Sequence, residues 1–80
     1  MKTRKKPYGN SNIVGARIEQ LRIEKKMSQK EFVSQLQVMG VDINPASYSK
    51  LEGQIRHVTD IELFAIAKVL HISIDELFHD

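Results

Sequence analysis

Residues 28–52 of this 80-residue chain read SQKEFVSQLQVMGVDINPASYSKLE, and they hold two helix start signals. The first is Ser28, whose hydroxyl can accept from a free backbone N–H while Glu31 reaches back to the N–H of Ser28, an arrangement called a capping box. The second is Asn44 followed by Pro45, because Asn is a strong helix N-cap and Pro suits the first helical position. The stretch therefore predicts two short helices joined by a connector.

The helix that follows Asn44 is about two turns long and has small polar side chains on one side. Such a helix can insert into a groove, so we interpret residues 28–52 as a helix-turn-helix. The helix before it runs from Gln29 to about Met39, where Gly40 supplies a left-handed stop. The apolar positions of this helix are Phe32, Val33, Leu36 and Met39. The connector contributes Val41 and Ile43, and the later helix contributes Tyr48 and Leu51.

The segment before the helix-turn-helix predicts one more amphipathic helix. Val14, Ile18 and Leu21 recur at helical spacing, and the pattern extends from about residue 12 to Lys26. Residues 1–11 show no such period, so we predict a flexible basic arm there, with a solvated tail as the alternative to a polyanion-binding segment. The basic residues of this arm are Lys2, Arg4, Lys5 and Lys6.

Two further capping boxes follow the helix-turn-helix, Thr59 with Glu62 and Ser73 with Glu76. Each precedes apolar residues at helical spacing, and no segment alternates like a strand, so residues 12–80 predict an all-α domain of five helices. The residues of the last two helices expected to face inward are Leu63, Ile66, Ala67, Leu70, Ile74, Leu77 and Phe78.

Composition excludes several classes of protein. The chain has no cysteine, which rules out disulfides and thiolate metal sites, and its three histidines are too scattered for a metal cluster, so no metal is expected. No apolar run reaches the roughly 18 residues of a membrane span, so we expect a cytoplasmic protein. Asp75 and Glu76 are adjacent rather than opposed, and no glycine-rich phosphate loop occurs, so neither catalysis nor a cofactor is expected.

Several short motifs occur in a fixed order along the chain. They are Val14–Ile18, Leu21-Arg22, Met27–Gln29, Glu31–Val33, Leu36, Ser49–Glu52, Ile66–Leu70 and Ile74–Phe78. In this order, over about residues 13–78, they closely resemble the lambda-repressor-like, Xre/Cro-type helix-turn-helix family. The resemblance implies a compact five-helix domain that binds double-stranded DNA as a homodimer on a roughly palindromic operator, and hence a transcriptional regulator of prokaryotic or phage type.

The resemblance also implies roles for individual residues. Gln29 matches a position that meets a phosphate, since helix N-termini attract anions, and Lys50 matches a groove-facing position from which it can donate to guanine O6 and N7. Arg22 and Glu52 match a structural ion pair between the first and third helices. The DNA-binding residues implied in this way are Ser28, Gln29, Lys30, Asn44, Pro45, Ala46, Ser47, Ser49, Lys50 and Arg56.

Two departures from the family pattern and one alternative function stay open. The connector within residues 37–44 is longer than is common, and Gln54 stands where relatives often have Gly, so Gly53 is expected to form the left-handed helix end. Tyr48 is interpreted as a core residue whose hydroxyl reaches water. The alternative function is an antitoxin-like or adaptor protein-interaction module, with the apolar and acidic segment Ile72–Phe78 as the surface for self-association or a partner.

Overall fold

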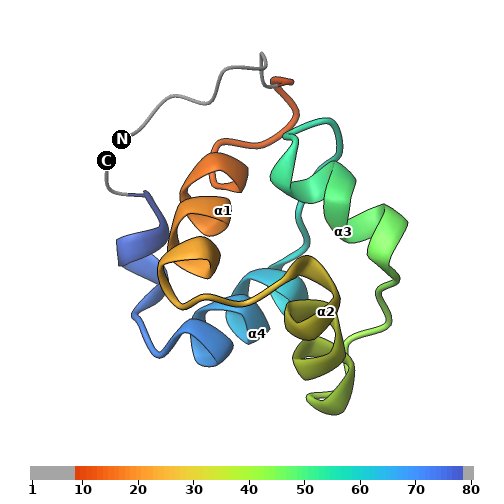
Figure 1. Ribbon diagram of the computed structural model, residues 1–80. Coiled ribbons are helices and arrows are strands. Elements are labelled where there is room, and N and C mark those ends of the chain that lie inside the picture. Colours follow the sequence, from red (N-terminus) through yellow and green to blue (C-terminus); the bar gives the residue numbers. More distant parts are fainter. Residues whose placement is uncertain (1–8, 79–80) are drawn as a thin grey trace.

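A computed structural model describes residues 9–78, and all regular elements in this part of the chain are helices, without strands (Figure 1). Its elements are α1 (Gly15–Glu24), α2 (Gln29–Val38), α3 (Pro45–Glu52), α4 (Asp60–Leu70) and the 3-10 helix η1 (Ile74–Phe78). The all-α prediction is confirmed, but the count of five α-helices is wrong. The fifth element has only five residues, and the bond from the N–H of Glu76 to the carbonyl of Ser73 has 3-10 spacing.

The start signals in the sequence form the expected hydrogen bonds. Both bonds of the capping box are present at Ser28 with Glu31 and at Thr59 with Glu62. Asn44 accepts at Oδ1 from the backbone N–H of the third residue of α3, and a Pro follows it. Because these bonds are local, three of the four α-helices begin at the predicted residue.

One helix end differs from the prediction. Gly40 has the expected positive φ of 92°, but Gly53 has a helical φ of −76°, and Gln54 takes the left-handed conformation with a φ of 62°. The expectation for Gly53 was therefore wrong. A tertiary contact helps to explain the difference, because Gln54 donates from Nε2 to the carbonyl of Asn12 at 2.6 Å.

The core lies between α1, α2, α3 and α4, where Phe32 and Tyr48 pack with ring centroids 5.3 Å apart. Met39, Ile74 and Phe78 were expected inside but are 45%, 39% and 49% exposed. Met39 lies past the end of α2. A 3-10 helix presents one narrow stripe, so in η1 only Leu77 is fully covered. The largest buried apolar side chains are Ile18, Phe32, Leu36, Tyr48, Leu51, Ile66, Leu70 and Leu77.

The long connector is held against the domain. Val41 and Ile43 are buried, as expected, and Gln37 donates from Nε2 to the carbonyl of Ile43 at 2.8 Å. The N–H of Val41 also donates to the carbonyl of Leu36. These contacts fix the start of α3 relative to the end of α2.

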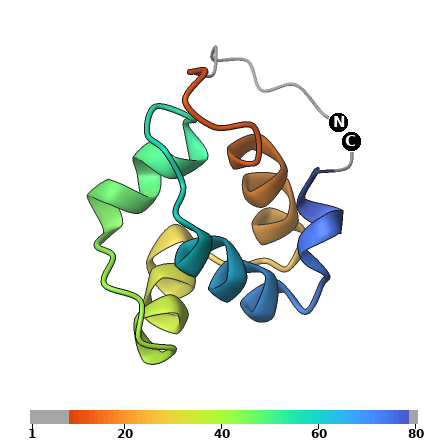
Figure 2. The ribbon, with the colours of Figure 1, turned by 180° about the vertical axis from the view of Figure 1, so that it is seen from behind.

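The helices of the domain pack in neighbouring pairs, and α3 packs against both α1 and α2. α1 lies beside η1 and α2 lies beside α4, as the front and back views agree (Figures 1 and 2). The start of α1 touches the end of α3 so closely that a Cβ on Gly15 would overlap the carbonyl oxygen of Leu51. No helix within residues 9–78 is long and apolar enough to cross a membrane.

Most of the predicted arm, residues 1–11, lies outside the described residues, as do His79 and Asp80. The last residues of that arm, from Gly9 onward, are described, and Gly9 and Ser11 donate backbone hydrogen bonds to residues that follow α3.

Candidate nucleic-acid interface

The outward face of α3 is the centre of the candidate interface. Ala46, Ser49 and Lys50 are exposed and follow one another at helical i, i+3 and i+4 spacing, so they share one face. Tyr48 and Leu51 on the opposite face are fully buried. This outward face therefore takes no part in the core, and Lys50 gives it one positive charge in the last turn of α3. The remaining predicted residues of this helix are Asn44 and Pro45, which are exposed, and Ser47, which is half-buried.

The start of α2 presents a second group of predicted residues. Ser28 and Lys30 are exposed and Gln29 is half-buried. Ser28 accepts the N–H of Glu31 at 3.0 Å, and its own N–H donates to Glu31 Oε1 at 2.9 Å. Two hydrogen bonds with Ser28 lower the pKa of Glu31, and the bond from the Ser28 backbone has the larger effect. The capped first turn is thus rigid, with the positive end of the helix dipole at the surface.

One hydrogen bond joins the starting turn of α2 to the last turn of α3. Gln29 donates from Nε2 to Glu52 Oε1 at 2.9 Å. The amide of Gln29 is therefore partly committed to the protein, although the resemblance assigned it to a phosphate. The bond holds the start of α2, where the predicted residues Ser28, Gln29 and Lys30 lie, beside the last turn of α3.

Behind this surface, a buried polar network surrounds Glu52, whose exposed fraction is zero. Arg22 donates from Nε to Glu52 Oε2 at 2.7 Å and from Nη2 to Oε1 at 3.1 Å, and from Nη1 to the carbonyl of Met27. The hydrogen bond to Glu52 is the main cause that raises the pKa of Arg22. Arg22 and Glu52 thus connect α1, the α1–α2 turn and α3.

Tyr48 belongs to the same network. Its hydroxyl donates to Glu52 Oε2 at 2.5 Å, and its side chain is completely buried. Burial, and then the charge of Glu52, raise the pKa of Tyr48. The expectation that this hydroxyl reaches water was therefore wrong. The spacing of four residues between Tyr48 and Glu52 was the signal in the sequence that could have revealed the bond.

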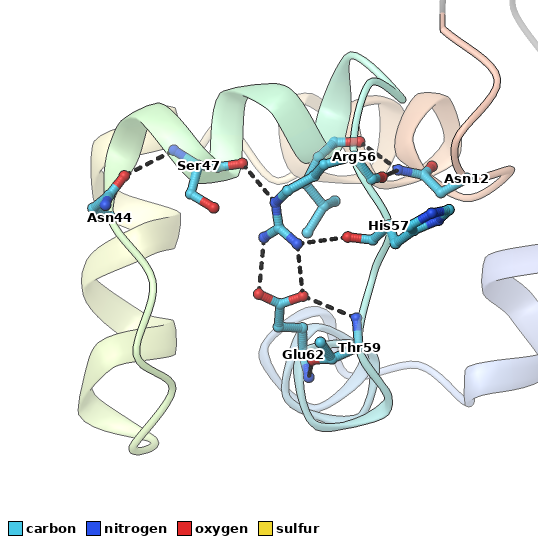
Figure 3. A network of polar contacts seen from close by, with 8 residues as sticks. Asn12, Asn44, Ser47, Arg56, His57, Thr59 and Glu62 are labelled. Carbon is cyan, nitrogen blue, oxygen red and sulfur yellow. Dashed lines mark hydrogen bonds and ion pairs between the residues drawn. The ribbon is translucent and has the colours of Figure 1, made fainter.

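Arg56 joins α3, the following loop and α4 (Figure 3). Its Nε donates to the carbonyl of Ser47 at 3.0 Å, and Nη1 donates to the carbonyl of His57 at 2.7 Å. Nη1 and Nη2 also hold both carboxylate oxygens of Glu62, at 2.9 and 2.8 Å. These bonds engage four of the five N–H groups of the guanidinium. We therefore assign Arg56 a structural role first, with one N–H left for the DNA contact expected from the sequence.

Two opposing effects act on the pKa of the Glu62 carboxylate. Burial alone would raise the pKa of Glu62, but the hydrogen bonds from Arg56 and from the backbone of Thr59 outweigh it, so the pKa is lowered. The carboxylate caps its own helix and binds Arg56 at the same time. The charged form of Glu62 is therefore part of what positions the loop after α3.

Asn12 is a structural residue that the sequence interpretation missed. It donates from Nδ2 to the carbonyls of Leu51 and Arg56 at 3.1 and 2.9 Å, and Oδ1 accepts the N–H of Gly15 at 2.9 Å. An Asn three residues before a helix start is a local capping signal, but its two long-range bonds have no such signal. Asn12 links the beginning of α1 to the end of α3.

The histidines stand apart from one another in the described part of the chain. His57 Nδ1 lies 3.0 Å from the carbonyl oxygen of Ser11, and His71 ends α4 with a φ of 59°. No group of three or more His, Asp or Glu side chains within residues 9–78 could hold a metal ion. The exposed polar and basic side chains of the candidate site, such as Ser28, Lys30 and Lys50, suit hydrogen bonding to a polyanion.

The consecutive helices α2 and α3, with α3 capped and one of its faces exposed, form the arrangement of the helix-turn-helix class. A family model described as Helix-turn-helix matches residues 18–77, so the chain belongs to this family, the lambda-repressor-like, Xre-type group of DNA-binding transcription regulators. The resemblance found in the sequence is thereby confirmed. Comparison with curated proteins gave no match, and comparison with solved structures gave none either.

Proposed function

We propose that this protein is a sequence-specific regulator that binds a roughly palindromic operator as a homodimer and acts by occupying a promoter, as regulators of prokaryotes and phages do. The observation that carries the proposal is the outward face of α3, with Ala46, Ser49 and Lys50 exposed and Glu52 bonded behind it. A rigidly supported helix of this kind can enter the major groove of B-DNA.

Each proposed contact follows from side-chain chemistry. Lys50 donates to O6 and N7 of a guanine, and Ala46 contacts at most a thymine methyl group. Ser49 and Ser47 donate to phosphates that flank the groove. Ser28, Gln29 and Lys30 meet a phosphate at the positive start of α2, while Asn44 and Pro45 lie at the edge of the groove.

The surface proposed for the homodimer is apolar. One shallow hollow between α4 and η1 is lined by Asp60 and by three apolar residues, Ile61, Phe64 and Ile74, which are 69%, 54% and 39% exposed. Phe78, further along η1, is 49% exposed. A cluster of large apolar side chains on a small domain is typical of a protein-interaction surface. Two of its residues, Ile74 and Phe78, belong to the segment Ile72–Phe78 that the sequence interpretation offered for self-association or for a partner.

The same surface supports a second candidate function, in which the chain is an antitoxin-like or adaptor module that pairs with another protein. Native mass spectrometry or light scattering separates the two. A stable homodimer favours the regulator, whereas a monomer that pairs only with a co-encoded protein favours the module.

DNA competition tests the leading proposal. A palindromic duplex obtained by selection, and a shuffled duplex of the same length, are each titrated with the protein at physiological salt. Specific regulators bind their sites at least about 10³-fold more tightly than other DNA. We expect a preference of this size. Equal retention of the two duplexes would contradict sequence-specific regulation.

A further inference from the structure

Different contacts hold the two ends of α3. The last turn is fixed by the buried ion pair of Glu52 with Arg22. The first turn follows the connector from α2, and there the backbone of Ser47 is held on both sides. Its N–H donates to Asn44 Oδ1 at 2.8 Å, and its carbonyl accepts from Arg56 Nε at 3.0 Å. The backbone of Ser47 is therefore the anchor of the first turn of α3.

Arg56 connects this anchor to α4. Among the helices of residues 9–78, α3 packs mainly against α1 and α2. The guanidinium of Arg56 lies between the carbonyl of Ser47 and the carboxylate of Glu62 on the first turn of α4 (Figure 3). A pair in which two N–H groups hold two carboxylate oxygens fixes orientation as well as distance. We call Ser47, Arg56 and Glu62 the α3–α4 clamp.

The charge of Arg56 is already neutralised within the clamp. The side chains of Arg56 and Glu62 are 21% and 11% exposed, and their closest charged atoms lie 2.8 Å apart. The salt-dependent part of DNA affinity comes from cations that neutralise phosphates, so an arginine that is paired with a carboxylate contributes little to it. The clamp is therefore better suited to holding α3 than to binding a phosphate.

The outward residues beside the anchor need accurate placement if they read bases. Ala46 directly precedes Ser47, and Lys50 follows it by one helical turn. Hydrogen bonds to base edges need donor–acceptor distances of about 2.7–3.2 Å, so a shift of α3 by about 1 Å would break them. Phosphate contacts depend mainly on charge and carry no sequence information. Loss of the clamp should therefore reduce selectivity more than general affinity for DNA.

We propose that Arg56 is a positioning residue, which through Ser47 and Glu62 sets the orientation of α3 and thereby the preference for the operator over other DNA. The proposal rests on the proposed function, since it takes α3 as the helix that reads bases. It gives Arg56 a role in selectivity, whereas the resemblance in sequence gave it a direct contact with DNA. The two roles differ in the selectivity ratio, the affinity for the selected duplex divided by that for the shuffled duplex.

Glu62→Gln separates the two roles. Gln can still complete the capping box with Thr59, but it offers Arg56 one uncharged acceptor oxygen in place of two charged ones. An Arg56 that contacted phosphate would be released by this change, so it would tighten binding to both duplexes alike and leave the selectivity ratio unchanged. The positioning role predicts that the ratio falls several-fold, although the protein becomes more positive. An unchanged ratio would overturn the proposal.

Arg56→Lys tests the same distinction from the other partner. Lys keeps the positive charge but loses the planar fork that holds both oxygens of Glu62 together with the carbonyl of Ser47. A phosphate contact needs only the charge, so it would survive and the selectivity ratio would be retained. We expect the ratio to fall by about 10-fold, the equivalent of one lost contact to a base. Full selectivity in Arg56→Lys would contradict a positioning role.

Thr59→Ala is the matched control for stability. It removes the hydroxyl that accepts the N–H of Glu62 at 3.1 Å, so it weakens the start of α4 without removing either charged partner of the clamp. Circular dichroism and urea denaturation check that all three variants are folded under the conditions of the binding assay. We expect Thr59→Ala to keep the selectivity ratio. A loss equal to that in Glu62→Gln would show a merely structural effect and would overturn the proposal.

The two proposals fail in different ways. If the unaltered protein binds the selected duplex no better than the shuffled one, then sequence-specific regulation is contradicted. If the unaltered protein is selective and both Glu62→Gln and Arg56→Lys remain equally selective, then only the positioning role of Arg56 is contradicted.

Discussion

Among single residues, Glu52 depends most on its hydrogen-bond partners, because its carboxylate is fully buried. It accepts hydrogen bonds from Arg22, Gln29 and Tyr48. The network contributes to the fold chiefly by fixing α3 relative to α1 and α2. Removal of one partner leaves a buried charge short of hydrogen bonds, which is far more destabilising than removal of the whole pair.

Arg22→Met should therefore lower the free energy of unfolding by about 3–5 kcal/mol, as measured by urea denaturation. The matched variant Arg22→Met/Glu52→Met removes both charges and should be clearly more stable than the single variant. If Arg22→Met lost less than about 1 kcal/mol, the value of an exposed ion pair, the structural role of this network would be contradicted.

The sequence alone could predict the exposed face of α3. It could not predict the hydrogen-bond partners of the polar side chains beside it. Ala46, Ser49 and Lys50 follow from helical geometry once the Asn44 cap fixes the start of the helix. In contrast, the amide of Gln29 is bonded to Glu52, 23 residues away. Such partners depend on the tertiary fold, so the sequence does not reveal that the side chain is already engaged.

At the scale of elements, the ion pair of Arg56 and Glu62 links the loop after α3 to the start of α4. The stability that this ion pair contributes depends on pH. The pKa of Glu62 is lowered in the folded protein, so between the folded value and the usual value near 4.3 the unfolded chain binds more protons. The stabilisation is therefore present above about pH 4.3 and is lost as pH falls through the lower, folded pKa.

Urea denaturation from pH 7 down to pH 3 should show a decline in the free energy of unfolding with falling pH. Part of that decline should be absent in Glu62→Gln, which cannot ionise and keeps a similar shape. If the free energy of unfolding fell with pH in the same way in the two proteins, the stabilising ion pair between Arg56 and a charged Glu62 would be contradicted.

The helix starts that carry a side-chain cap were predictable from the sequence, whereas the start of α1, expected near residue 12 and found at Gly15, and the helix ends were less so. A cap such as Thr59 with Glu62 involves residues three apart and needs no tertiary information. The ends at Lys26, Gln54 and His71 use positive φ without glycine, with values of 59°, 62° and 59°. A non-glycine residue in this conformation is held there by its surroundings, which the local sequence does not describe.

At the scale of the whole molecule, the outward face of α3, which we propose reads DNA, and the apolar face of α4 and η1 are distinct surfaces. The apolar face contains Ile61, Phe64 and Ile74 around one hollow. The proposed function requires that a homodimer formed there hold its two copies of α3 one DNA helical turn, about 34 Å, apart.

Phe64→Glu places a charge in that hollow and should shift the protein from dimer to monomer, as measured by sedimentation equilibrium. It should also weaken binding to a palindromic duplex more than binding to a single half-site. Ile23→Glu is the matched control, because Ile23 is 58% exposed on α1, outside the hollow. A dimer that persists in Phe64→Glu would place the interface elsewhere.

The central claim is that α3 reads bases, and Lys50 is its only cationic residue. The most direct measurement is selection of bound duplexes from a random pool, made in parallel with the unaltered protein and with Lys50→Ala. We predict a palindromic consensus for the unaltered protein and, for Lys50→Ala, relaxed preference at one guanine per half-site, equivalent to about 1–3 kcal/mol. An identical consensus from both proteins, or none from either, would contradict the claim.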